Sequence, residues 1–233
     1  MKEQITSDKK TARTAGILYL LLAITAPYGL IYVPSQIFVK GDAAASAENV
    51  LSNEFLFRTG VASHMVSQVL FILVVLLLYK LLKQVNKHWA RVMVALVAIS
   101  LPLALLSDIL NISGLMVLKG GLLNLFEPGQ VNEIAGIFFK TGSNVIQVTQ
   151  LDWGLWLFPF GMLVYKSGFI PRIFGILLTL NGIGYVLLSF TFVLFPESQS
   201  LVFKIAMPLL FVGEFPTIVW LLIKGVNPPK GGT

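Results

Sequence analysis

Long apolar runs separated by short polar loops occupy almost the whole chain. A helix needs about 20 mostly apolar residues to cross the hydrocarbon core of a bilayer. The runs are continuous and do not alternate in polarity, so they predict membrane-spanning helices and not the strands of a barrel. The six expected spans are residues 14–36, 57–82, 90–118, 141–165, 171–195 and 201–223.

Two of these runs need interpretation. The first continues through Tyr32, which is longer than the apolar core of a signal peptide, roughly 7–15 residues. We therefore predict a retained helix. The fourth run is the least uniform and contains Asp152; we expect a short interfacial helix near Gln130 followed by the span itself.

The pattern predicts an all-α fold, a polytopic transmembrane bundle of about six helices. We expect a basic tail over residues 1–13, one membrane domain over residues 14–224 and a second tail over residues 225–233. The loops are too short to form a separate soluble domain.

Composition and charge indicate that the chain lies in lipid and how it is oriented in the membrane. Only 12% of the residues are charged and 56% are hydrophobic, against about 25% charged in soluble domains. Of the 17 basic residues, twelve fall on the side that holds both termini. The positive-inside rule therefore predicts cytoplasmic termini and a multi-pass protein of the cell (inner or plasma) membrane. Because these basic residues flank spans, they indicate no nucleic-acid partner; the lipid bilayer is the expected one.

Ionisable side chains inside the spans are the candidate functional residues. A charge at mid-bilayer costs about 2.5–3.5 kcal/mol on insertion scales, so such residues usually mark a site. We expect them to meet, with neighbouring amides, around a cavity that opens outward. The candidate binding residues are His64, Gln68, Asp108, Asn111, Asp152, Asn181 and Glu214.

Several kinds of chemistry lack their usual residues. The chain has no cysteine and only two histidines, without the spacing of a zinc site, so we expect neither a metal nor a cofactor. A P-loop, a dinucleotide fingerprint and a G-x-S-x-G elbow are also missing from the sequence. No catalytic residue is assigned.

Local strings of the sequence resemble a bacterial multi-pass membrane family, domain of unknown function 4386. The most specific string is Ser167–Arg172, between the fourth and fifth spans. The others are Arg13–Tyr19, Leu56–Arg58, Leu78–Lys80, Tyr165–Gly175 and Gly184–Tyr185. The resemblance implies six or seven helices in a bacterial inner membrane and no established activity. It transfers no catalytic residue.

Three functions fit these observations. The first is binding or transport of a small molecule or lipid through the polar cavity, with helix breaks at Pro102, Pro159, Pro208 and Pro216. The second is a non-catalytic partner or assembly subunit of another membrane protein, in which the polar residues only hold helices together. The third is an intramembrane, hydrolase-like enzyme that uses His64 and the acids. The lack of a recognised motif disfavours the enzyme.

Overall fold

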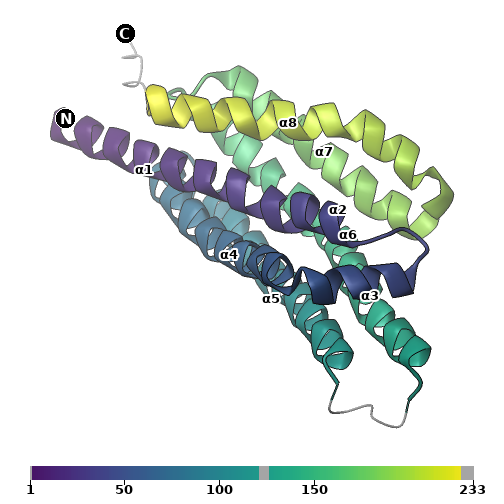
Figure 1. The fold of residues 1–233 in the computed structure, drawn as a ribbon. Helices are drawn as coiled ribbons and strands as arrows, with labels where there is room; N and C mark the ends of the chain where they lie inside the picture. The colour runs from purple at the N-terminus through teal and green to yellow at the C-terminus, as the bar shows by residue number, and fades with distance from the viewer. Residues whose placement is uncertain (1, 121–125, 227–233) are drawn as a thin grey trace. The chain divides into compact units, whose positions relative to one another are not determined.

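The chain is almost entirely helical in a computed structural model, which describes residues 2–120 and 126–226 (Figure 1). Within those ranges there is no strand, which confirms the all-α fold class. The helical elements are α1 (Lys2–Pro27), η1 (Tyr28–Tyr32), α2 (Val33–Ile37), α3 (Ala43–Ser52), α4 (Glu54–Leu82), α5 (Lys87–Leu118), α6 (Pro128–Ser167), α7 (Arg172–Leu194), η2 (Pro196–Ser198) and α8 (Gln199–Ile223).

The described residues contain five helical stretches that are long and apolar enough to cross a membrane. They correspond to the first, second, third, fifth and sixth expected spans, and the protein is a polytopic membrane protein. The stretches are Ser7–Ile37, Glu54–Leu82, Lys87–Leu118, Arg172–Leu194 and Pro196–Ile223. Helix α1 already begins at Lys2, so residues 2–13 of the expected tail are helical. Most of the other tail, from residue 227 on, lies outside the described residues.

The fourth expected span, residues 141–165, lies within α6, which is long enough to span but less apolar than the other five stretches. The expectation of a separate interfacial helix near Gln130 is wrong, because α6 runs without a break from Pro128 to Ser167. From residue 151 to residue 164 no side chain of α6 is exposed. A helix covered by protein to this extent does not need the fully apolar surface that lipid demands.

The expected breaks at prolines are also wrong. Pro102, Pro159, Pro208 and Pro216 each lie inside a continuous helix. Each still removes one backbone donor, so the carbonyl four residues earlier loses its helical partner. In membrane helices such carbonyls are tolerated when neighbouring groups take over their hydrogen bonds.

The backbone contacts divide the chain into two compact units. Unit 1 comprises residues 1–21, 70–101 and 147–233, and unit 2 comprises residues 22–69 and 102–146. Helices α1, α4 and α5 therefore contribute one part to each unit, as does α6.

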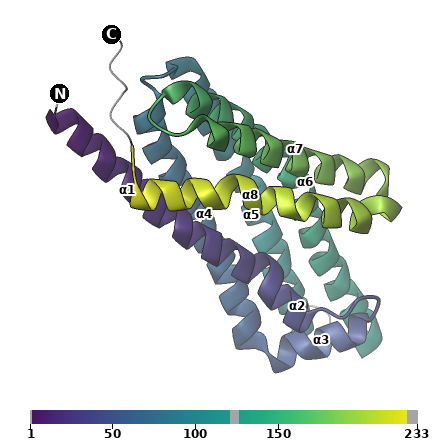
Figure 2. The same ribbon diagram turned by 90° about the horizontal axis from the view of Figure 1, so that it is seen from above.

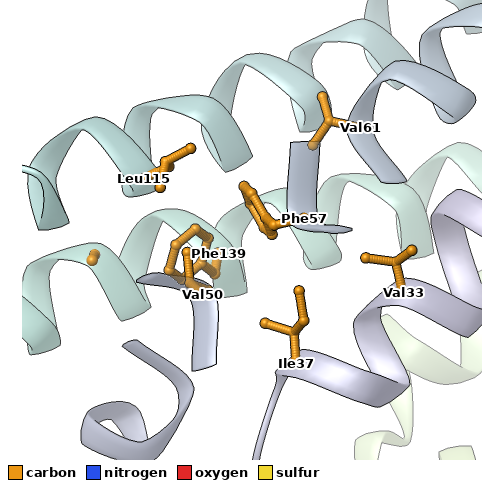
Figure 3. Close-up of a cluster of buried hydrophobic side chains, with 8 residues drawn as sticks. Val33, Ile37, Val50, Phe57, Val61, Leu115 and Phe139 are labelled. Carbon is orange, nitrogen blue, oxygen red and sulfur yellow. The ribbon is translucent and has the colours of Figure 1, made fainter. Parts of the chain in front are cut away.

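Unit 2 has an apolar core that collects side chains from five helices. Phe57 of α4 and Phe139 of α6 pack edge to face with ring centroids 5.7 Å apart (Figure 3). Val33 and Ile37 of α2 and Leu115 of α5 are buried beside them. The short helix α3 adds Val50 to this core, and the Asp42 carboxylate caps α3 by accepting the Ala45 N–H at 2.8 Å.

Unit 1 contains the α7–α8 hairpin, whose two helices lie side by side in both ribbon views (Figures 1 and 2). Against α7, helix α6 packs with its backbone in close approach: a Cβ added to Gly154 would lie 2.6 Å from the Gly182 carbonyl oxygen. Gly161 and Gly175 repeat the arrangement, again at 2.6 Å. Small residues at such crossings are typical of membrane helices, since lipid leaves van der Waals packing as a main attraction between them.

Candidate functional site

The first polar group inside the spans is a histidine–aspartate pair in unit 2. His64 Nδ1 of α4 lies 2.8 Å from Asp108 Oδ1 of α5. The two residues are only 2% and 5% exposed, so water contributes little to their solvation. Within a buried pair of this kind each partner compensates for the lost hydration of the other.

Gln68 extends this pair by one turn of α4. Its Nε2 lies 3.1 Å from His64 Nε2 and 3.2 Å from Ser67 Oγ. An amide N–H donated to Nε2 leaves the ring proton on Nδ1, where it is donated to Asp108, so this arrangement describes a neutral histidine beside a carboxylate. A doubly protonated ring would require the opposite amide orientation, with Gln68 Oε1 as the acceptor.

Asp108 has one oxygen that this network does not use. Its Oδ2 is buried and has no hydrogen-bond partner among the described residues. A cavity of about 30 Å³ adjoins the pair, which is room for a water molecule or a group of similar size. Its polar lining is His64, Ser107, Asp108 and Asn111, and its apolar lining includes Leu30, Val33, Phe38, Phe57 and Val61.

The backbone of η1 and α2, which follows α1 directly, forms one side of this cavity. The Val33 N–H bonds to the Tyr28 carbonyl, five residues earlier, which defines the π-helical turn. Pro34 follows and offers no N–H to the Leu30 carbonyl, so the α-helical ladder cannot continue unchanged. Single π turns of this type occur frequently at functional sites.

Two glycines allow this segment to touch α4. A Cβ on Gly29 would lie 2.6 Å from the Gly60 carbonyl oxygen and 3.0 Å from His64 Cβ. The Ser63 hydroxyl of α4 also donates to the Thr25 carbonyl of α1 at 2.9 Å. The cavity therefore depends on close backbone approach, which sequence reasoning did not foresee for Gly29 or Gly60.

The serines near His64 do not form the hydrogen bonds of a serine hydrolase. Ser67 donates to the His64 carbonyl at 2.6 Å, and Ser107 donates to the Gly142 carbonyl at 2.8 Å. Both hydroxyls thus donate to backbone carbonyls, whereas a nucleophilic serine has to form a hydrogen bond with the imidazole ring.

The second polar group lies in unit 1, where α1, α7 and α8 meet. Glu214 Oε1 accepts the Tyr19 hydroxyl, and Glu214 Oε2 accepts the Asn181 Nδ2 at 3.0 Å. Gly213 permits this contact, because a Cβ there would lie 2.6 Å from Asn181 Cβ. Sequence reasoning missed Tyr19; a tyrosine placed well inside a span was the available signal, since its hydroxyl needs a partner there.

The structure thus sorts the seven candidate residues into two groups and two single positions. His64, Gln68 and Asp108 are joined by hydrogen bonds in unit 2, and Asn181 and Glu214 are joined in unit 1. Asn111 lines the cavity in unit 2. Asp152, on α6, is half-buried and belongs to neither hydrogen-bonded group.

Among the described residues, no group of three or more histidine or acidic side chains is placed to hold a metal ion. The fold and its two buried polar groups define a polytopic α-helical membrane protein with ionisable residues inside its spans. A family model described as domain of unknown function (DUF4386) matches residues 14–225, and the chain belongs to this family. This confirms the resemblance carried by the local strings. No curated protein and no solved structure matches the chain.

Proposed function

We propose that the protein binds a small amphipathic molecule whose polar end donates hydrogen bonds, an amine above all, at the His64–Asp108 cavity. The observation that carries this proposal is that Asp108, a residue that lines the cavity, has a buried oxygen, Oδ2, without a hydrogen-bond partner. A buried acceptor left unsatisfied costs about 1–3 kcal/mol, and more when it is charged. A ligand donor supplied to this oxygen recovers that free energy.

The charge of the pair supports a cationic ligand. A neutral His64 leaves the Asp108 carboxylate with no positive partner, because no lysine or arginine in the described residues forms an ion pair with it. The cavity of about 30 Å³ takes only the polar end of the ligand. Its apolar lining, which includes Phe38 and Phe57 with ring centroids 6.3 Å apart, suits the carbon atoms next to that end. Aromatic rings also attract ammonium groups through their π faces.

A ligand panel tests the proposal on the purified protein. Short n-alkylammonium ions, n-alcohols and n-carboxylates are added in turn, and thermal unfolding in detergent is recorded. A ligand at ten times its dissociation constant stabilises the folded state by about 1.4 kcal/mol. For a chain of this size that corresponds to roughly 3–6 °C in melting temperature, and we expect it for the ammonium series.

Asp108→Asn removes the charge and should abolish this shift. Asp152→Asn is the matched control, since it removes another intramembrane carboxylate that does not line the cavity. Equal shifts in the wild type and in Asp108→Asn, or no shift with any member of the panel, would contradict the proposal.

We also propose that α6 crosses the membrane, so that both termini lie on the same side, which the positive-inside rule places in the cytoplasm of a bacterial cell. The antiparallel contact of α1 with α8 supports this topology. Arg13 donates to the Ile223 carbonyl at 3.4 Å, and a Cβ on Gly16 would lie 2.9 Å from the Leu222 nitrogen. Two antiparallel spans at the chain ends require an even number of crossings, and the five apolar stretches become six only with α6.

The absence of cysteine makes a direct test of topology possible. Single cysteines at Lys166, in the exposed end of α6, and at Glu197, between α7 and α8, are treated with a membrane-impermeant maleimide on intact cells. If α6 crosses, Glu197→Cys is labelled from outside and Lys166→Cys only after lysis. The reverse pattern would contradict this topology.

A further inference from the structure

A carboxyl group without a basic partner lies inside unit 1, on the last span. Glu214 receives its two hydrogen bonds from Tyr19 and Asn181, both of which are neutral. No lysine, arginine or histidine of the described residues forms an ion pair with it. A full negative charge in this position would be opposed only by dipoles, in surroundings where charges are costly.

The Asn181 amide beside this carboxyl lacks a hydrogen-bond donor for its oxygen. Asn181 is completely buried, and its Oδ1 has no hydrogen-bond partner among the described residues, while its Nδ2 already donates to Glu214. An unpaired amide oxygen beside a carboxylate is a poor arrangement, since both are acceptors. A proton on the carboxyl supplies a donor that an amide oxygen can accept, so one proton improves both groups.

We propose that Glu214, Asn181 and Tyr19 form a proton-binding site, in which the Glu214 carboxylate takes a proton from hydronium and returns it to water. The step is balanced: the carboxylate and hydronium give the carboxylic acid and water. This site does not depend on ligand binding at the His64–Asp108 cavity.

The groups around Glu214 suit a reversible exchange. Tyr19 of α1 and Tyr185 of α7 are the titratable side chains that interact with it electrostatically. Helix α6 contributes Trp156, whose ring lies 6.4 Å from that of Tyr19. Glu214 itself is half-buried between the helices. Pro216 has no N–H, so the Val212 carbonyl, one helical turn before Pro216, loses its helical donor. This carbonyl can then accept a hydrogen bond from water.

Infrared difference spectroscopy of the purified full chain at pH 7 tests the site. A neutral carboxylic acid has a carbonyl stretch separate from that of a carboxylate. We expect such a band in the wild type, its loss in Glu214→Gln and its retention in Asp152→Asn. In D₂O the band should shift within minutes, because the proton exchanges. Asn181→Leu should move the band without removing it, since the carboxyl keeps its proton but loses the amide.

Isotope labelling keeps the test valid if Glu214→Gln does not fold. In wild-type protein grown with ¹³C-glutamate, a band that belongs to Glu214 shifts, whereas a band from an aspartate does not. Three results would overturn the proposal: no glutamate band, a band insensitive to D₂O, or a band that disappears in sodium buffer but persists in choline buffer. The last result would mean that a metal cation, and not a proton, occupies the carboxyl.

Discussion

Unequal losses of stability are expected when the two sides of the His64–Asp108 pair are removed one at a time. His64→Leu leaves Asp108 with two buried oxygens and no partner, because Oδ2 is already unpaired. Asp108→Leu leaves His64 with one unpaired Nδ1, while its Nε2 keeps the contact with Gln68. The first variant leaves a buried charge without a partner, and the second leaves only a neutral donor without one.

The magnitudes follow from this difference. Leaving a buried charge without its partner costs about 3–5 kcal/mol in soluble proteins. Interhelical polar contacts in membranes average about 0.6 and reach about 1.7 kcal/mol, because the unfolded chain in the membrane also finds partners. We therefore expect a cost of about 3 kcal/mol for His64→Leu, the lower end of the soluble range. A stranded neutral group costs about 1 kcal/mol, which we expect for Asp108→Leu.

The double variant provides the decisive comparison. With both polar groups replaced by leucine no buried charge remains, so we expect a total loss of at most about 2 kcal/mol, less than for His64→Leu alone. The difference from additivity is then about 2 kcal/mol. Unfolding in mixed detergent and dodecyl sulfate, followed by the fluorescence of the four tryptophans, measures each loss. Additive losses, or a larger loss for Asp108→Leu than for His64→Leu, would refute the assignment of a stranded carboxylate.

Three further changes test other parts of the structure. Gly154→Ala brings a Cβ to 2.6 Å from the Gly182 carbonyl oxygen and should cost about 1–3 kcal/mol; Gly129→Ala, where no atom lies within 4 Å, is the control in the same unfolding assay. Pro34→Ala restores a backbone donor after the π turn, so we expect weaker stabilisation by alkylammonium ions in the melting assay, and an unchanged shift would argue against a role for the turn. Glu54→Gln removes surface ion pairs to Arg58 at 2.8 Å and Lys119 at 3.0 Å and should cost less than about 1 kcal/mol, with the loss shrinking further in high salt.

The fold class was predictable because lipid restricts the possibilities so strongly. Backbone groups must be satisfied within the span, so a long apolar run can only be a helix there. The same logic explains the one span that stood out. Helix α6 carries Thr149, Gln150 and Asp152, which lower its hydropathy, yet none of its residues 151–164 is exposed. The length and hydropathy of an apolar run identify helices that face lipid. They miss a spanning helix that faces mainly other helices, because such a helix can carry more polar residues.

The pairing of the site residues was less accessible from sequence. Depth along a helix can be counted, so His64 and Asp108 could be placed at a similar level of two neighbouring spans. Which faces of two helices meet depends on their rotation and crossing, and a single sequence does not encode these in any simple pattern. Tyr19 illustrates the limit: its partner Glu214 is 195 residues away, and no local spacing connects them.

Glycine positions explain how the helices around both polar groups come close together. In lipid, apolar side chains gain little by leaving the solvent, so helices stay together through close packing and polar contacts. Gly29 brings η1 against α4 beside His64, and Gly213 brings α8 against α7 beside Asn181. In each case a missing Cβ sets the distance at which the polar side chains meet. Each acid and its hydrogen-bond partners therefore depend on the glycine contact beside them. Backbone approach fixes the geometry of each polar group as much as the ionisable residues do.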